Sequence, residues 1–340
     1  MKSTRRLWRS FLLILALLGA SAGPAPAQSR QELIEGAKRE GKFVLYTSMS
    51  LDDSQPLLQA FEKKYPFLKG EIYRASGEKL LNKALTEARA GQILFDVFSN
   101  SGFEVHLAQK ANLLSPYHSP EARGYREGFR HPQGYWTDLY DNYYVIGYNT
   151  KLVRPEEVPR RWEDLLHPRW KGNFALDEEE FEWYGAMLLA WGEERGRRFM
   201  KALAAGQPLL RKGHTLIAQL LSAGEFPVGL VYAHRIEELK RKGAPVEWVT
   251  TTDPIVAGMR PIALSARPKS PNAAKLFIDF VLSAEGQAII RDLDRMAARP
   301  EIGLRNPAID KSKLKLFPVS PALADRSETI MAEFRELFAR

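Results

Sequence analysis

The chain has 340 residues, of which 45% are hydrophobic, and a formal net charge of +8. It contains no Cys, which excludes a disulfide framework, a thiolate nucleophile and a Cys-ligated zinc site. Its basic residues form no run with interleaved aromatics, so the composition does not favour a nucleic-acid partner. A chain of this length can bury two cores, and we therefore expect two lobes.

The first 27 residues have the order of a secretory signal peptide. Basic residues from Lys2 to Arg9 precede the apolar run "FLLILALLGA", and "APA" at 25–27 offers small residues for cleavage before Gln28. The run is short for a membrane span, although an uncleaved N-terminal anchor is the alternative interpretation. No Cys follows it, so a lipid anchor on that residue is excluded. Four of the 49 basic residues and none of the 41 acidic ones lie in this segment, so the exported chain carries +4.

The first half of the exported chain alternates between strands and helices. Short β-branched and aromatic runs predict strands over 42–48, 68–74 and 95–101, and apolar periodicity predicts helices over 55–66 and 77–91. Strands separated by helices of this length indicate βαβ units and a mainly parallel sheet. Ligands of such sheets bind outside the carboxyl ends of the strands.

The second half continues in the same style with different elements. We expect strands over 142–149, 173–177, 226–232 and 245–251. Within 161–172 we expect a short helix that Pro168 stops, and further helices are predicted over 179–192, 193–206, 213–225 and 235–243. A strand and two packed helices follow over 260–292, and an amphipathic helix over 321–340 ends the chain.

Three segments carry a resemblance to a known family. They are "RWEDLLHPRWKG", "GHTLIAQLLSAGEFPVGLVYAHR" and "KSPNAAKLFIDFVLSAEGQ". With the order of elements, they resemble the type II periplasmic solute-binding proteins of ABC importers, in particular the ferric-iron, thiamine and phosphonate receptors. The resemblance implies an α/β fold with two lobes, each a mainly parallel sheet flanked by helices, and two crossover strands near 144–148 and 255–264.

The same resemblance implies a domain organisation and a role. Residues 28–143 with 256–300 would form lobe 1, residues 144–255 lobe 2, and the helices within 301–340 would pack on either lobe. The protein would be a periplasmic monomer that binds a small solute between its lobes and delivers it to an inner-membrane permease, without enzymatic activity or a cofactor. An exported ligand sensor and an enzyme on the same fold are the alternatives, but no GxSxG, HExxH or P-loop motif occurs.

The segment "GLVYAHR" supplies the strongest site candidates, Tyr232, His234 and Arg235. They stand where a buried strand becomes a helix, a turn that would face the cleft. A basic pair is unfavourable at a helix N-terminus, which favours an anionic partner nearby. Alternatively, Tyr232 only packs and Arg235 pairs with Glu237 or Glu238. If protonated His234 holds an anion, affinity should fall as the pH rises through about 6.5.

Other candidates occupy equivalent turns and the crossover. Each has a structural alternative, such as capping a helix for the serines or packing in the core for the aromatic residues. His214 either caps its helix or faces the cleft, and we prefer the cap. The candidate ligand-binding residues in this group are Ser48, Ser50, Asn100, Ser101, Tyr140, Asn142, Asp177, Trp183 and Tyr184.

The ligand expected from the sequence is a small anionic or zwitterionic organic molecule. In the ferric receptors of the family that this chain resembles, two adjacent tyrosines after the equivalent of the "GLV" strand bind the metal, often together with a His from the first loop. Here His234 and Arg235 occupy the tyrosine positions and Ser50 the His position. Arg cannot ligate a cation. Ferric iron or an iron chelate, with Tyr232 and His234 as the metal ligands, is the alternative.

Overall fold

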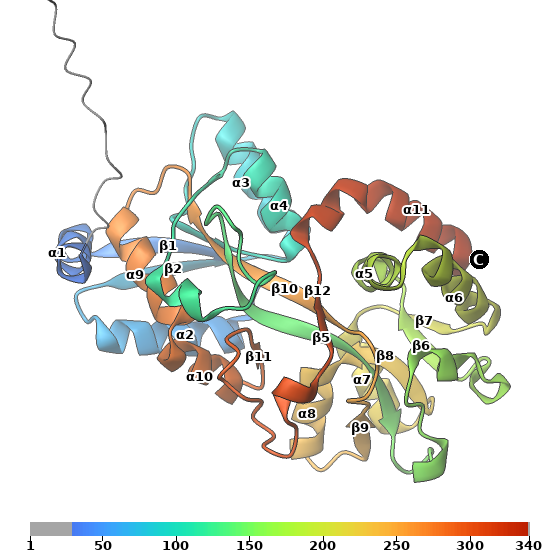
Figure 1. Ribbon diagram of the computed structural model, residues 1–340. Coiled ribbons are helices and arrows are strands. Elements are labelled where there is room, and N and C mark those ends of the chain that lie inside the picture. The colour runs from blue at the N-terminus through green and yellow to red at the C-terminus, as the bar shows by residue number, and fades with distance from the viewer. Residues whose placement is uncertain (1–28, 339–340) are drawn as a thin grey trace, which may run out of the picture.

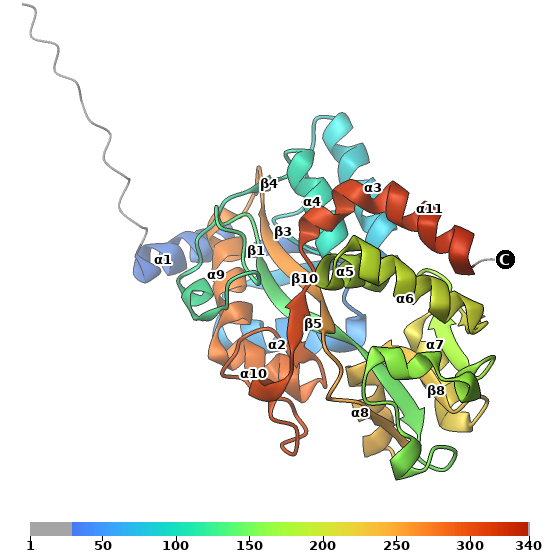
Figure 2. The ribbon, with the colours of Figure 1, turned by 45° about the vertical axis from the view of Figure 1, so that its right-hand side comes forward.

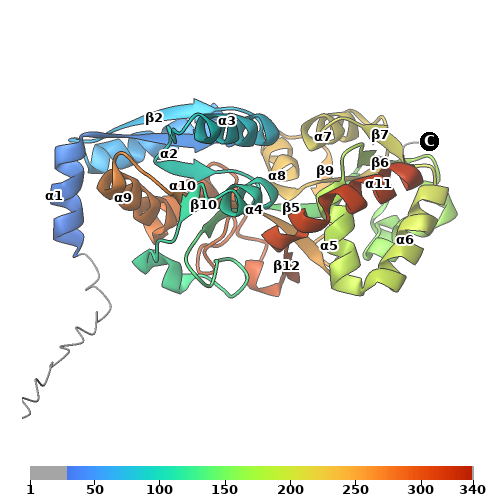
Figure 3. The same ribbon diagram turned by 90° about the horizontal axis from the view of Figure 1, so that it is seen from above.

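The computed structural model describes residues 29–338, so the predicted signal peptide at 1–27 lies outside the described residues. Two lobes lie side by side, joined by long strands that run through the middle of the molecule (Figure 1). The view from above separates the half with α1 and α9 from the half with α5 and α6 (Figure 3). Within residues 29–338, no helix combines the length and apolar character that a membrane span requires.

The elements follow the order expected of an α/β chain. The α-helices are α1 (Arg30–Glu40), α2 (Leu51–Lys64), α3 (Gly77–Arg89), α4 (Gly102–Lys110), α5 (Phe181–Trp191), α6 (Glu193–Ala205), α7 (His214–Ala223), α8 (Ala233–Arg241), α9 (Pro271–Leu282), α10 (Ala284–Asp292) and α11 (Ser327–Phe338). The strands are β1 (Lys42–Thr47), β2 (Lys69–Arg74), β3 (Val97–Ser99), β4 (Leu114–Ser115), β5 (Thr137–Asn149), β6 (Phe174–Asp177), β7 (Leu209–Arg211), β8 (Val228–Tyr232), β9 (Val246–Trp248), β10 (Ile255–Ser265), β11 (Met296–Ala297) and β12 (Leu316–Pro318).

The strands of residues 29–338 form one continuous sheet that spans both lobes. Its main path has the order β2-β1-β3-β10-β5-β8-β6-β7, with short strands added beside β5 and β10. Pairing is parallel among β2, β1 and β3 and among β8, β6 and β7, whereas β10 and β5 pair antiparallel with each other, with β3 and with β8. Each lobe therefore has a parallel group, and β5 and β10 are the two crossover strands.

Buried side chains gather in two clusters, but the clusters do not coincide with the lobes. The larger cluster fills the first lobe and continues through β5 to α7 and α8 of the second. The smaller one lies beneath α5, α6 and α11, where Phe334 packs against Phe181 and Tyr184. The terminal helix α11 thus rests on the second lobe, beside α5 and α6 (Figure 2). The lobe boundaries expected from the sequence stay predictions.

Two predicted helices differ from the structure. The segment expected to begin the terminal helix forms a 3₁₀ turn over Pro321–Arg326, and α11 begins at Ser327. Residues 161–172 form two short 3₁₀ turns, Trp162–Leu166 and Pro168–Trp170, in place of one α-helix. Pro168 offers no N–H group, and His167 before it adopts an extended backbone with ψ of 136°. The segment still turns its apolar Trp162 into the core, where this side chain is fully buried.

Candidate functional site

A cavity of about 480 Å³ lies where the two lobes meet, which is within the size range of small-molecule sites. The first lobe and the crossover strands contribute Ser48, Met49, Ser50, Arg74, Tyr140, Asn142, Arg260 and Arg295. The second lobe contributes Lys212, Gly213, His214, Thr215, Leu216, Gln219, Tyr232, His234 and Arg235. Both lobes thus present polar side chains to one shared space.

The topology explains why these residues meet. In the first lobe, β1 ends just before Ser48, and Arg74 is the last residue of β2. In the second lobe, β7 ends just before Lys212, and Tyr232 is the last residue of β8. All four strands belong to the parallel groups, so the cavity lies at the carboxyl ends of strands from both lobes, where ligands of such sheets bind.

Three helices begin at the cavity. Ser50, Gly213 and Tyr232 are the N-cap residues of α2, α7 and α8, and none of them caps its helix through a side-chain hydrogen bond. All three line the cavity. The positive ends of three helix dipoles therefore point toward it, an arrangement that favours negative charge.

The lining carries basic side chains and, among the described residues, no Asp or Glu. The basic residues are Arg74, Lys212, Arg235, Arg260 and Arg295. Three of the arginines are paired with carboxylates that lie outside the lining. Arg295 Nε donates to Asp53 at 3.0 Å, Arg235 Nη1 donates to Glu238 at 3.1 Å, and Arg260 Nη2 lies 3.5 Å from Glu182.

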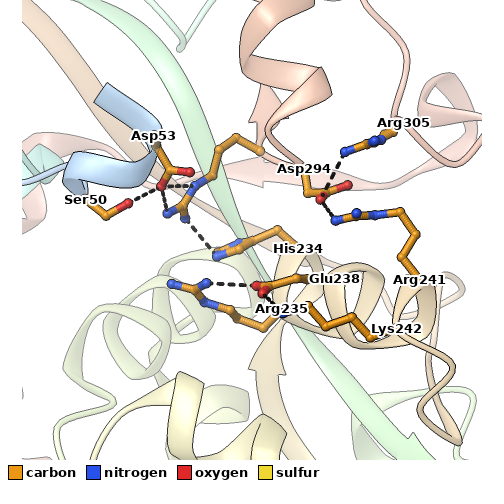
Figure 4. Close-up of polar contacts among 10 residues, drawn as sticks. Ser50, Asp53, His234, Arg235, Glu238, Arg241, Lys242, Asp294 and Arg305 are labelled. Carbon is orange, nitrogen blue, oxygen red and sulfur yellow. Dashed lines mark hydrogen bonds and ion pairs between the residues drawn. The ribbon is translucent and has the colours of Figure 1, made fainter. Parts of the chain in front are cut away.

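Each of these carboxylates thereby orients one of the cavity arginines. Glu182 also accepts a hydrogen bond from the Tyr144 hydroxyl at 2.6 Å, which fixes it between β5 and β10. Figure 4 shows the pair of Arg235 with Glu238, and it labels Asp53, which accepts from Arg295. A guanidinium oriented in advance loses less freedom when it binds an anion.

Three rings stack on the wall of the second lobe. The Tyr232 ring lies between those of His214, at 3.7 Å between centroids, and His234, at 5.5 Å. The Tyr232 hydroxyl lies 3.5 Å from that of Tyr144. Burial raises the pKa of Tyr232 above its ordinary value, which makes the phenolate still less accessible at physiological pH.

The two histidines differ in charge. Burial lowers the pKa of His234 well below its ordinary value, and Arg295 and Arg235 lower it further. Burial also lowers the pKa of His214, but Glu180 at 3.4 Å and Asp177 at 3.9 Å outweigh burial and leave that pKa raised. A protonated His234 is therefore disfavoured in this structure, because the ring is buried and lies beside cations, which counts against the pH dependence that the sequence suggested for this residue.

Seven of the candidates chosen from the sequence meet in the cavity, namely Ser48, Ser50, Tyr140, Asn142, Tyr232, His234 and Arg235. Arg235 lines the cavity and also pairs with Glu238, so its position fits both interpretations, and its contact with a ligand stays a prediction. His214 lines the cavity as well, whereas Gly213 occupies the N-cap position that we had preferred for it.

Five candidates lie outside the lining. Asn100 donates to the Gly77 carbonyl at 2.9 Å, and Ser101 donates to Glu104 at the start of α4. Asp177 accepts from the Glu179 backbone N–H at 3.0 Å, beside His214. Trp183 and Tyr184 are buried in the second core, because α5 turns these aromatic faces toward α6 and α11.

The sequence reasoning missed Arg74, Lys212, Arg260 and Arg295. One signal was available for Arg260, which is the lone charge in the apolar strand "IVAGMRPIALS". A charge inside a buried strand needs a partner, and is therefore a candidate functional group. Arg295 follows α10 in the polar stretch "RDLDR", where nothing in the pattern distinguishes it.

The fold and the shared cavity define the class of two-lobed periplasmic binding proteins. Residues 93–318 match the family of bacterial extracellular solute-binding proteins, and the chain belongs to that family. Within residues 29–338, no group of three or more His, Asp or Glu side chains is arranged to hold a metal ion.

Similar sequences include an uncharacterised protein of Haemophilus influenzae and an Fe(3+)-binding periplasmic protein of Serratia marcescens. The first is 27% identical over 297 residues, 83% of this chain and 85% of the relative. The second is 21% identical over 267 residues, 76% of this chain and 78% of the relative.

Similar solved structures include iron-bound HitA from Pseudomonas aeruginosa and AfuA from Actinobacillus pleuropneumoniae with fructose-6-phosphate bound. The match to HitA has a TM-score of 0.76 at 18% identity, and it covers 87% of this chain and 99% of the HitA chain. The match to AfuA has a TM-score of 0.73 at 21% identity, and it covers 88% of this chain and 99% of the AfuA chain. At these identities the likeness shows the shared fold, and the bound ligands belong to those proteins.

Proposed function

We propose that this protein is the periplasmic substrate-binding component of an ABC importer and that it captures a small anionic organic solute between its lobes. The observation that carries the proposal is the charge of the cavity. Five basic side chains line it, while no carboxylate does so among the described residues. Electrostatic complementarity of this kind selects the sign of a ligand's charge.

The ligand chemistry that fits is an oxyanion with polar groups around it. Arginine offers parallel N–H donors that match a carboxylate or a phosphoryl group, and helix N-termini supply further N–H groups. Asn142 and Gln219 can bond to hydroxyl or carbonyl groups of the rest of the solute. Fructose-6-phosphate in AfuA is an anionic organic solute of this kind. An amine would meet only like charges among the ionised side chains of the lining.

An iron chelate is the second candidate, because relatives of this chain are iron-binding proteins. The basic lining would repel a bare ferric ion. A ferric ion carried by an anionic chelator avoids that repulsion, and a structure from Trichodesmium contains iron and citrate. Tyr232 would be the protein's phenolic ligand in that case.

A thermal-shift screen of the purified chain without residues 1–27 tests the proposal. The panel contains sugar phosphates, phosphonates, carboxylates, amines, ferric chloride and ferric citrate. We expect anions to raise the melting temperature and amines to leave it unchanged. Stabilisation by amines alone, or by ferric chloride with loss of the effect in Tyr232→Phe, would overturn the proposal.

Titration of two matched variants then locates the anion. Arg235 and Lys242 both pair with Glu238, but Lys242 lies outside the cavity lining. Loss of a charge-assisted hydrogen bond costs about 1.5–3 kcal/mol, so Arg235→Ala should weaken binding by about tenfold to a hundredfold. Lys242→Ala should leave affinity unchanged. Equal effects of the two variants would show that Arg235 acts only through its pair with Glu238.

A further inference from the structure

Asp53, Arg295 and His234 form a chain of contacts between the lobes. Arg295 donates through Nε to Asp53 Oδ2 at 3.0 Å, and its Nη2 reaches the same oxygen. Its Nη1 lies 2.8 Å from His234 Nε2. Asp53 belongs to α2 of the first lobe and His234 to α8 of the second, and the two face the same guanidinium in Figure 4.

The contact with Arg295 decides which nitrogen of His234 carries the proton. A guanidinium only donates hydrogen bonds, so His234 Nε2 must accept. The ring proton therefore lies on Nδ1 and the imidazole is neutral. The charged groups that act on the ring agree with this assignment, since Arg295, Arg235, His214 and Arg260 all oppose a further positive charge.

The Nδ1–H group is a donor without an acceptor. His234 is 3% exposed, and its Nδ1 has no hydrogen-bond partner among the described residues. Arg235 Nε, one residue further along α8, is likewise buried and unpartnered within that part of the chain. Both residues line the cavity at the first turn of α8, which carries no acidic residue. A buried donor left unpaired is costly, and an acceptor atom of a solute would remove that cost.

We infer that Asp53 and Arg295 are positioning residues that fix His234 as a neutral donor through Nδ1, so that α8 receives an oxygen acceptor of the solute. The inference rests on the proposed function in one respect, namely that the solute occupies this cavity. The acceptor is an oxyanion or hydroxyl oxygen. An ammonium group is rejected there, because both unpaired groups are donors. Residues of the first lobe thereby determine which ring nitrogen of His234, on the second lobe, donates a hydrogen bond and which accepts one.

Nitrogen-15 NMR of the histidine-labelled protein without any ligand tests the assignment. The His234 signals are identified by their loss in His234→Asn. We expect the neutral tautomer with the proton on Nδ1 between about pH 5 and 8. A proton on Nε2, or a ring that becomes charged in that range, would overturn the inference and would leave the proposal of an anionic solute standing.

Two variants separate the chain of contacts from general packing. Arg295→Met removes the donor to Nε2, so the tautomer preference should weaken and the pKa of His234 should rise toward its ordinary value. Arg241→Met is the matched control, because it breaks the ion pair with Asp294 at the other end of α8 (Figure 4). It should leave the His234 signals unchanged. Equal changes in both variants would contradict a specific role for Arg295.

Inorganic phosphate serves as the probe for the acceptor. As phosphate is added, the Nδ1 proton signal should move while the ring stays neutral, because the N–H gains an acceptor. An unmoved signal at saturating phosphate contradicts the selection of an acceptor at α8. Protonation of the ring on addition of phosphate contradicts the neutral donor.

Discussion

His214 and His234 show how strongly the neighbours of a side chain determine its charge. Both are buried and both stack on Tyr232, yet one lies beside carboxylates and the other beside guanidinium groups. Because the pKa of His214 is raised and that of His234 is lowered, His214 keeps its positive charge to a higher pH than His234 does. The pH dependence that the sequence suggested for His234 is thus expected from His214.

Affinity for an anion should fall as the pH rises through the raised pKa of His214, because the cation that faces the cavity is lost. The sign follows from the direction of the shift: His214 is protonated below its folded-state pKa, which lies above about 6.5, and neutral above it. Loss of one charge should weaken binding by up to about tenfold. The measurement is calorimetric titration with a carboxylate whose own charge is constant above about pH 5.

His214→Gln should remove this pH dependence, and the exposed His118→Gln should keep it. An affinity that rises with pH in the unsubstituted protein would show that His214 does not contribute a cation to the site.

The crossover strands β5 and β10 position the arginines as well as joining the lobes. Gly258 on β10 faces Asn142 on β5, and a Cβ at position 258 would lie 2.9 Å from Glu182 Oε2 and from Tyr144 Cε2. Glu182 holds both Arg260 and the Tyr144 hydroxyl. The glycine is therefore what allows α5 to place a carboxylate against the crossover.

Gly258→Ala should destabilise the protein by about 1–3 kcal/mol, because the buried Tyr144 ring or Glu182 must move. Urea denaturation measures the change in the free energy of unfolding. Gly303→Ala is the control, since a Cβ there has no atom within 4 Å. If the two variants lose the same stability, close packing at Gly258 is not the cause.

Element types were largely predictable from the sequence, whereas more than half of the cavity lining was not. Strand β1 follows from "KFVLYTS", and α3 follows from the apolar spacing that ends at Gly91. Residues at strand ends, such as Ser50 and Tyr232, could be located because the carboxyl ends of parallel strands share one edge. Arg295 could not, because it reaches the cavity through tertiary contacts with Asp53 and His234 that leave no local pattern.

At the scale of the whole molecule, α8 connects the site to the relative position of the lobes. Its first turn contacts Arg295 through His234, and its last turn contacts Asp294 through Arg241. Two consecutive residues of the first lobe therefore hold both ends of one helix of the second. A solute that binds at the start of α8 would therefore meet a contact between the lobes.

The central claim is that one anionic solute is held by both lobes at once. A crystal structure of the protein with the anion that gives the largest thermal shift tests it most directly. We predict that the anionic group contacts Arg235 or His234 of the second lobe, while the same molecule contacts Ser50, Arg74 or Arg295 of the first. A ligand bound outside this cavity, or one that contacts side chains of a single lobe, would contradict the claim.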